Sequence, residues 1–339
     1  MSLMKLGVYN AILHDRSLPD ALEVIGGLGL TGIEINSGGF LPATHIPNFD
    51  DILSSDTARD DYLGLFEGTG VQIAGLNCNG NPLHPNKIIA DKHADDIRRS
   101  IVLANRLGQD RVVTMSGLPG DHAGAKYPNW IVNAWNSAAL DVLDYQWSVA
   151  VPFWQEMDKL AADLDVKVAL ELHPQNLVFN TADVFKFVEL TGVTHTGVEL
   201  DASHLFWQQM DPVAVTRALG SLVYQAAAKD VRVNEQWAAL YGVLDNRFRR
   251  LSADEPRTNL GGDEWANEWP KESAWDFVAL GKGHDTAFWA EFLRALHEID
   301  PGMLVNIEHE DVSLGRIEGL QVAATVLTDA DAALAASLV

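Results

Sequence analysis

Short apolar runs alternate along the chain with longer segments in which apolar residues recur every three or four positions. The short runs are typical of buried strands, and the longer spacing is typical of amphipathic helices. The predicted strands are Lys5–Tyr9, Gly32–Asn36, Gln72–Leu76, Arg111–Met115, Lys167–Leu172, His195–Leu200, Leu222–Ala228 and Met303–Glu308. The predicted helices are Ser17–Leu28, Asp56–Glu67, Lys87–Leu107, Phe153–Leu164, Thr181–Leu190, Pro212–Leu219, Thr286–Ile299 and Leu314–Leu334.

Eight predicted strands that alternate with eight predicted helices indicate a parallel sheet. Because eight parallel strands close a (β/α)8 TIM barrel, we predict an α/β barrel that forms a single domain over residues 4–339. An open, doubly wound sheet is the second candidate. The first predicted strand is not followed by a glycine-rich phosphate-binding turn, which disfavours the doubly wound fold.

Two connections are much longer than the ~2–6 residues that usually join a strand and a helix. The longer one, 231–283, follows the seventh predicted strand and contains four tryptophans. In a barrel it would lie at the carboxyl ends of the strands, where active sites are built. We therefore expect either a lid over the site or a contact between subunits of a homo-oligomer. The second long connection runs from Gly117 to about Val151.

The composition narrows the class of protein. The 339 residues are 47% hydrophobic, which is enough to bury a core without cross-links. A net charge of −23 argues against a partner that is a nucleic acid or an anionic membrane. The single cysteine, Cys78, fits a reducing compartment. No apolar run approaches ~18 residues and no signal peptide is evident, so we expect a cytoplasmic protein.

Polar residues gather at the carboxyl ends of the predicted strands, and three of them are carboxylates. Glu171, Asp201 and Glu308 each follow a run of apolar residues. Three carboxylates that converge on one barrel mouth would repel one another unless a divalent cation lay among them. The alternative is that each carboxylate caps a helix or pairs with a lysine or an arginine.

Two histidines follow these carboxylates closely. His173 comes two residues after Glu171, so strand alternation directs both side chains to the same face. His204 comes three residues after Asp201 and can reach the same mouth. Oxygen ligands favour Mn²⁺ or Mg²⁺, and a nearby imidazole would admit Co²⁺, Zn²⁺ or Fe²⁺.

Six short motifs occur in order from the third predicted strand to the eighth. They are Asn81-Pro82-Leu83-His84-Pro85, Leu170-Glu171-Leu172-His173-Pro174, Leu200-Asp201-Ala202-Ser203-His204, Ala228-Lys229-Asp230, Gly281-Lys282-Gly283-His284-Asp285 and Ile307-Glu308-His309-Glu310-Asp311. With these motifs the chain resembles the xylose isomerase-like TIM-barrel superfamily, in its branch of sugar phosphate isomerases and epimerases. The resemblance is specific for the superfamily and leaves the substrate open.

The resemblance implies four metal ligands at the ends of strands five to eight: Glu, Asp, His and Glu. Glu171, Asp201 and Glu308 match the first, second and fourth positions. The third position departs from the family, because the chain has Gln225-Ala226-Ala227 where relatives have His-x-His. The amide oxygen of Gln225 is the expected substitute, and His284, His204 or water are the alternatives. An all-oxygen set would shift the preference toward Mn²⁺ or Mg²⁺, and manganese is the expected metal.

The resemblance also implies proton abstraction beside a carbonyl, through an enediolate that a metal stabilises. Glu171 and Glu308 match the positions that remove and return protons, and His204 is a further candidate catalytic residue. The expected substrate-binding residues are His84, His173, His204, Lys229 and His284. We therefore predict a metal-dependent isomerase or epimerase that acts on a keto-sugar or a sugar derivative.

Three other functions stay open at this point. The same carbanion leads to a lyase or dehydratase if a β-substituent leaves, as on a 3-keto glycoside or an inosose. Loss of the histidine pair also fits a non-catalytic sugar-binding barrel or a subunit. An activity like that of endonuclease IV is disfavoured by the charge of −23.

Overall fold

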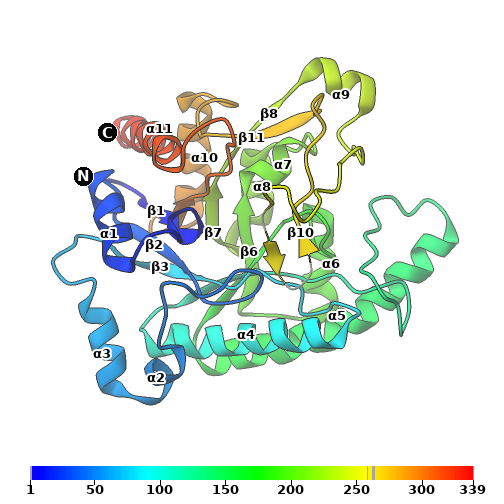
Figure 1. Ribbon diagram of the computed structural model, residues 1–339, viewed down its shortest axis with the longest axis horizontal. Helices are drawn as coiled ribbons and strands as arrows, with labels where there is room; N and C mark the ends of the chain where they lie inside the picture. Colours follow the sequence, from blue (N-terminus) through cyan, green and yellow to red (C-terminus); the bar gives the residue numbers. More distant parts are fainter. Residues whose placement is uncertain (1, 258, 262–263, 339) are drawn as a thin grey trace.

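Eight parallel strands close into a barrel in the computed structural model, which describes residues 2–257, 259–261 and 264–338 (Figure 1). The strands follow the order β1-β12-β7-β6-β5-β4-β3-β2. They are β1 Lys5–Tyr9, β2 Gly32–Asn36, β3 Gln72–Asn77, β4 Arg111–Met115, β5 Lys167–Glu171, β6 Thr196–Asp201, β7 Val223–Ala228 and β12 Leu304–Ile307. The closed ring confirms the predicted α/β barrel and contradicts the doubly wound alternative.

Helices surround the barrel, and Figure 1 shows α4 and α5 running side by side along one edge of the molecule. The helices outside the long insertion are η1 Asn10–Leu13, α1 Leu18–Gly27, α2 Phe49–Ser54, α3 Asp56–Gly64, α4 Lys87–Arg106, α5 Ser137–Asp163, α6 Thr181–Thr191, α7 Ala202–Phe206, α8 Pro212–Leu219, η2 Gly220–Leu222, α10 Thr286–Ile299 and α11 Arg316–Ser337. No helix in the described part of the chain is both long and apolar enough to cross a membrane.

Helix α5 begins at Ser137, which corrects the predicted start at Phe153. The Asn136 side chain caps the helix by accepting a hydrogen bond from the Ala139 N–H at 3.1 Å. The helix continues through Pro152 although proline removes one backbone donor. One buried stripe explains this continuity, because apolar positions at spacings of three and four face the core on both sides of the proline. The stripe consists of Trp147, Ala150, Trp154, Met157 and Ala161.

The described part of the long insertion after β7 contains regular secondary structure. It contains β8 Asp230–Val233, α9 Glu235–Tyr241, β9 Asn259–Gly261, β10 Glu264–Trp265 and β11 Trp275–Val278. Strands β8 and β11 pair antiparallel and place Val233 opposite Trp275. Residues 258, 262, 263 and 339 of the predicted domain lie outside the described residues. Figure 1 shows α9 and the β8–β11 pair rising above the end of the barrel.

The interior of the barrel contains a polar layer. Glu34 on β2 accepts hydrogen bonds, each of 2.7 Å, from the side-chain amides of Asn77, Gln225 and Asn306. Burial raises the pKa of Glu34 to about 7, and these amide donors oppose that shift. Gly7 makes room for the layer, since a Cβ at this position would lie 2.3 Å from Asn306 Oδ1.

The chain ends meet on the same side of the molecule (Figure 1). The backbone N–H groups of Leu3 and Met4 donate to the Asp331 carboxylate on α11, each at 2.9 Å. These bonds connect the segment that enters β1 to the last helix of the fold.

Candidate metal and active site

Three strand-end carboxylates meet at the mouth of the barrel. Glu171, Asp201 and Glu308 come from the ends of β5, β6 and β12, and one oxygen of each lies within 4.8 Å of the others. Their side chains are 2%, 0% and 8% exposed, which removes them from the screening of bulk water. We call these three residues the carboxylate cluster.

Lys229 lies directly against this cluster. Its Nζ is 3.2 Å from Glu308, 3.8 Å from Asp201 and 2.9 Å from Glu310. Burial alone would lower the pKa of Lys229, but these carboxylates raise it well above its usual value. Asp201 also caps α7, because its Oδ1 accepts from the Ser203 N–H at 2.8 Å. The pairing alternative from the sequence therefore applies to Glu308 and Asp201, and the capping alternative applies to Asp201.

The carboxylates of the cluster differ in proton affinity. Burial would raise the pKa of Glu171, but the contact with His204, together with His173 and Lys229, lowers it to about 2. Burial raises the pKa of Glu308 well above its usual value, and Lys229 only partly opposes the shift. The difference follows from their positions, since Glu171 faces the two imidazoles.

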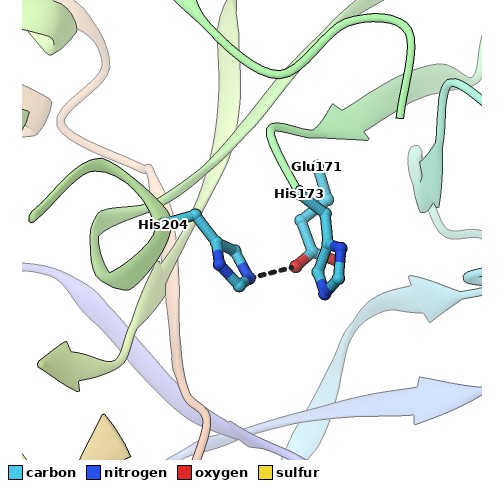
Figure 2. Close-up of side chains that lie close together, drawn as sticks. All are labelled: Glu171, His173 and His204. Atoms are coloured by element: carbon cyan, nitrogen blue, oxygen red, sulfur yellow. Dashed lines mark ion pairs between the residues drawn. The ribbon is translucent and has the colours of Figure 1, made fainter. Parts of the chain in front are cut away.

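A second group of ligand-type atoms shares Glu171. Ligand atoms of Glu171, His173 and His204 lie within 4.8 Å of one another, and we call these residues the histidine niche. Figure 2 shows the His204 ring directed at the Glu171 carboxylate, with Nε2 at 3.3 Å from Oε1. The rings of His173 and His204 pack edge to face at 4.4 Å between centroids. Asn79 donates to the other oxygen of Glu171 at 2.5 Å.

The insertion contributes a wall to this site. The Phe277 ring from β11 lies 4.4 Å from Lys229 Nζ and 5.8 Å from the His204 ring. Behind it, Trp275 stacks on Trp207 at 5.3 Å with an angle of 10° between the planes. Part of the long segment after β7 therefore packs against the mouth of the barrel through aromatic contacts.

Three of the residues predicted for the site contact groups outside the carboxylate cluster. Gln225 donates its amide to Glu34 in the polar layer below the cluster. His284 lies 2.8 Å from Asp230 and stacks on Phe206 at 3.6 Å. His84 accepts a hydrogen bond from the backbone N–H of Asn86 in its own turn.

Three residues near the site were not singled out from the sequence. Asn79 follows β3 in an asparagine-rich run, and this run could have identified it as a site residue. Glu199 lies two residues before Asp201 on the same face of β6, and burial raises its pKa well above the usual value. No sequence pattern indicated that Phe277 lies at the site, because its position depends on how the insertion folds back.

The carboxylate cluster has the chemistry of a divalent cation site. Among the described residues, it carries three carboxylates against the ammonium group of Lys229. Among the described residues, Asp201 Oδ2 accepts no hydrogen bond although it is buried. A buried carboxylate oxygen that accepts no hydrogen bond is costly, and a divalent ion would compensate that cost. The donor atoms therefore fit a hard or borderline divalent ion.

The sequence profile of the xylose isomerase-like TIM barrels matches residues 22–330, and the chain belongs to this family. A relative in Bacillus subtilis (strain 168), the uncharacterized protein YfiH, is 32% identical over 328 residues. That match covers 96% of this chain and 98% of the relative.

Solved structures show the same fold at low identity. The probable 3-DHS dehydratase AsbF from Bacillus anthracis, involved in petrobactin synthesis, has a TM-score of 0.64 at 16% identity, covering 96% of this chain and 99% of that one. The IOLI protein with a bound zinc atom has a TM-score of 0.61 at 18% identity, covering 98% and 99%. A D-tagatose 3-epimerase-like protein has a TM-score of 0.61 at 17% identity, covering 99% and 100%.

Proposed function

We propose that this protein is a metal-dependent isomerase or epimerase that acts on a keto-sugar or a sugar derivative. The observation that carries the proposal is the carboxylate cluster, in which three buried carboxylates meet and one oxygen of Asp201 accepts no hydrogen bond from the described residues. An epimerase-like protein and a zinc-containing barrel of the same fold support it.

Glu171, Asp201 and Glu308 would hold the ion, with manganese or magnesium favoured because all three donors are oxygen atoms. When bound, such an ion supplies Lewis-acid stabilisation of negative charge on the oxygens of the substrate. Glu171 Oε1 removes a proton from the carbon beside the carbonyl, and Glu308 returns one. His204 Nε2, which lies 3.3 Å from Glu171 Oε1, orients a substrate hydroxyl or passes the proton on.

The second candidate function is a lyase or dehydratase on a 3-keto glycoside or an inosose. Its first step is the same proton abstraction by Glu171, followed by departure of a β-substituent in place of reprotonation. The aromatic wall at Phe277 favours a substrate with more apolar surface than a bare pentose. The probable 3-DHS dehydratase AsbF, with its similar fold, also supports this candidate.

Metal content is the first test of the proposal. Protein purified without chelator should contain about one divalent ion in the carboxylate cluster, and Glu171→Ala and Glu308→Ala should each reduce the content. Glu189→Gln, an exposed carboxylate on α6, is the matched control and should leave the content unchanged. Protein that stays free of metal after soaking in Mn²⁺ and Mg²⁺ would instead support a sugar-binding or subunit role.

Turnover is the second test. Metal-loaded protein is screened on ketoses and on 3-keto glycosides, and the product separates the isomerase from the lyase. We expect Glu171→Gln to abolish turnover, a loss of about 10²–10⁴-fold or more, because the amide cannot accept the proton. Full activity in this variant would refute the proposed mechanism.

A further inference from the structure

A buried positive charge lies against the carboxylates that would hold the divalent ion. The Lys229 side chain is 3% exposed, and its Nζ lies 3.2 Å from Glu308 Oε2 and 3.8 Å from Asp201 Oδ2. An ammonium group and a divalent ion attract the same oxygen atoms and repel each other. Both effects are strong at this site, because bulk water does not screen buried charges.

Strand β7 contributes this charge in place of a metal ligand. The neighbours of β7 in the barrel are β6, which ends at Asp201, and β12, which ends directly before Glu308. On β7 itself, Gln225 donates to Glu34 in the polar layer and residues 226–228 are alanines. Lys229 follows directly, so an ammonium group stands between two strands that each supply a carboxylate.

Glu310 gives Lys229 a partner outside the carboxylate cluster. Its Oε1 accepts a hydrogen bond from Lys229 Nζ at 2.9 Å, compared with 3.2 Å for Glu308. The Glu310 side chain is 53% exposed and belongs to the segment 308–315, which contains no helix or strand. Since lysine has three donors on a flexible four-carbon chain, Lys229 can release the cluster and keep its bond to Glu310.

We propose that Lys229 competes with the divalent ion for the carboxylate cluster, and that Glu310 holds Lys229 when the ion is bound. The charge of Lys229 weakens binding of the ion, and Glu310 limits this weakening. The two residues therefore set the affinity of the site without being ligands. The inference rests on the proposed function, because it concerns the same ion, and it adds what determines how tightly that ion binds.

The test measures the Kd of Mn²⁺ for the full chain, freed of metal by dialysis, from the EPR signal of free Mn²⁺. Lys229→Met should bind at least about tenfold more tightly than wild type, because methionine has a similar length beside Phe277 and no charge. Glu310→Gln should bind about three- to tenfold more weakly, because Lys229 then stays with Glu308 and Asp201.

Two matched controls change the same residue types at exposed positions. Lys159→Met alters a lysine on α5 whose side chain is 77% exposed, and Glu189→Gln alters an exposed glutamate on α6. Both should keep the wild-type Kd, since a charge in bulk solvent has little effect on a buried site.

A double variant separates an effect through Lys229 from a direct effect of Glu310. If Glu310 acts by holding Lys229, Glu310→Gln should not change the Kd in the Lys229→Met background. A Glu310 that binds or attracts the ion by itself would weaken binding by the same factor in both backgrounds. That result would overturn its role as the partner of Lys229.

Thermal unfolding provides a second readout. Without the ion, Lys229→Met leaves Glu308 and Asp201 without this counter-charge, so the metal-free variant should unfold at a lower temperature than metal-free wild type. Saturating Mn²⁺ should raise the unfolding temperature by more in the variant, because tighter binding stabilises more. Lys229→Gln, which keeps a donor but no charge, replaces the methionine variant if that variant does not fold.

The outcomes distinguish the inference from the proposed function. Equal or weaker Mn²⁺ binding in the Lys229 variants would overturn the inference, and the proposed function stands if Glu171→Ala abolishes that binding. Wild-type affinity in Glu310→Gln would overturn the role of Glu310. Binding in Lys229→Met but not in wild type would support the competition and refute a metal-dependent function. Absence of binding in every variant would refute both.

Discussion

Single residues of the same type have different roles in this barrel because their hydrogen-bond partners differ. Glu34 is fully buried and accepts from three amide groups. Glu199 is equally buried, but neither of its carboxylate oxygens accepts a hydrogen bond from the described residues. A carboxylate with three donors anchors the polar layer, whereas burial of an unpaired one favours its neutral form.

Glu34→Gln tests the anchoring role. Glutamine is nearly isosteric, but it turns an amide donor toward the amide donors of Asn77, Gln225 and Asn306. We expect a loss of about 1–3 kcal/mol in the free energy of unfolding, measured by urea denaturation at pH 8. Glu189→Gln on the surface is the control, and an equally small effect in both variants would contradict the role of Glu34.

His14 predicts a pH dependence of stability. Burial, followed by the charges of His45 and Arg316, lowers the pKa of His14 to about 4 from a usual value of about 6.5. Between these pH values the unfolded chain binds the proton and the folded protein does not, so stability falls as the pH drops from 6.5 to 4. Because His14 is partly exposed, we expect it to contribute only about 1–2 kcal/mol of this loss.

His14→Phe should reduce this acid-side loss while leaving stability at pH 8 nearly unchanged. The measurement is urea denaturation at several pH values between 4 and 8. His122→Phe, at an exposed position, should leave the slope as in wild type. An unaltered slope in His14→Phe would show that other groups cause the acid sensitivity.

At the scale of elements, strands β8 and β11 of the insertion form an antiparallel pair, and residues 234–274 connect them as a long excursion. Strands β8 and β11 pair along their whole length and join the aromatic contacts at the site. The excursion of residues 234–274 begins and ends at the paired residues Val233 and Trp275. Among the described residues, none of the eight barrel strands takes a strand partner from the excursion. The barrel should therefore fold without it.

Replacing residues 234–274 by Asn-Gly tests both this independence and the predicted role of the insertion. A two-residue Asn-Gly turn suits an antiparallel pair, so Val233 and Trp275 should stay opposite each other. We expect native circular dichroism, unchanged metal content and cooperative unfolding. A smaller mass by light scattering would identify an interface, and weaker substrate binding at unchanged mass would identify a lid. Loss of cooperative unfolding would contradict the independence of the barrel.

At the scale of the whole molecule, the charge of −23 is the dominant feature. Acidic residues at the mouth of the barrel add to this field, and Lys229 is buried among them. Such a field attracts cations and repels polyanions at low ionic strength. It therefore fits a metal site and an uncharged carbohydrate better than it fits nucleic acid.

A nucleic-acid binding experiment tests this conclusion. Fluorescence anisotropy of labelled duplex DNA at about 50 mM salt should show no binding, since the counterion release that drives association needs clustered lysines and arginines. An acidic protein of similar size is the control. Binding that weakens steeply with added salt would contradict the exclusion of nucleic acid as a partner.

Much of the barrel could be predicted from the sequence because its signals are local. Alternation and apolar runs locate the eight barrel strands to within one residue at each end, and strand direction places Glu171, Asp201 and Glu308 at one end. The start of α5 was missed because Pro152 interrupts the local pattern, while the buried stripe across it is a tertiary requirement.

The sequence by itself determined the fold class and the carboxylates at the mouth of the barrel, because strand period and burial are properties of neighbouring residues. Only the tertiary structure decided which other residues each of these side chains contacts. It directs Gln225 to Glu34, places Lys229 among carboxylates from other strands, and brings Phe277 back over the site. These choices depend on residues far apart in the chain, whose contacts no local pattern records.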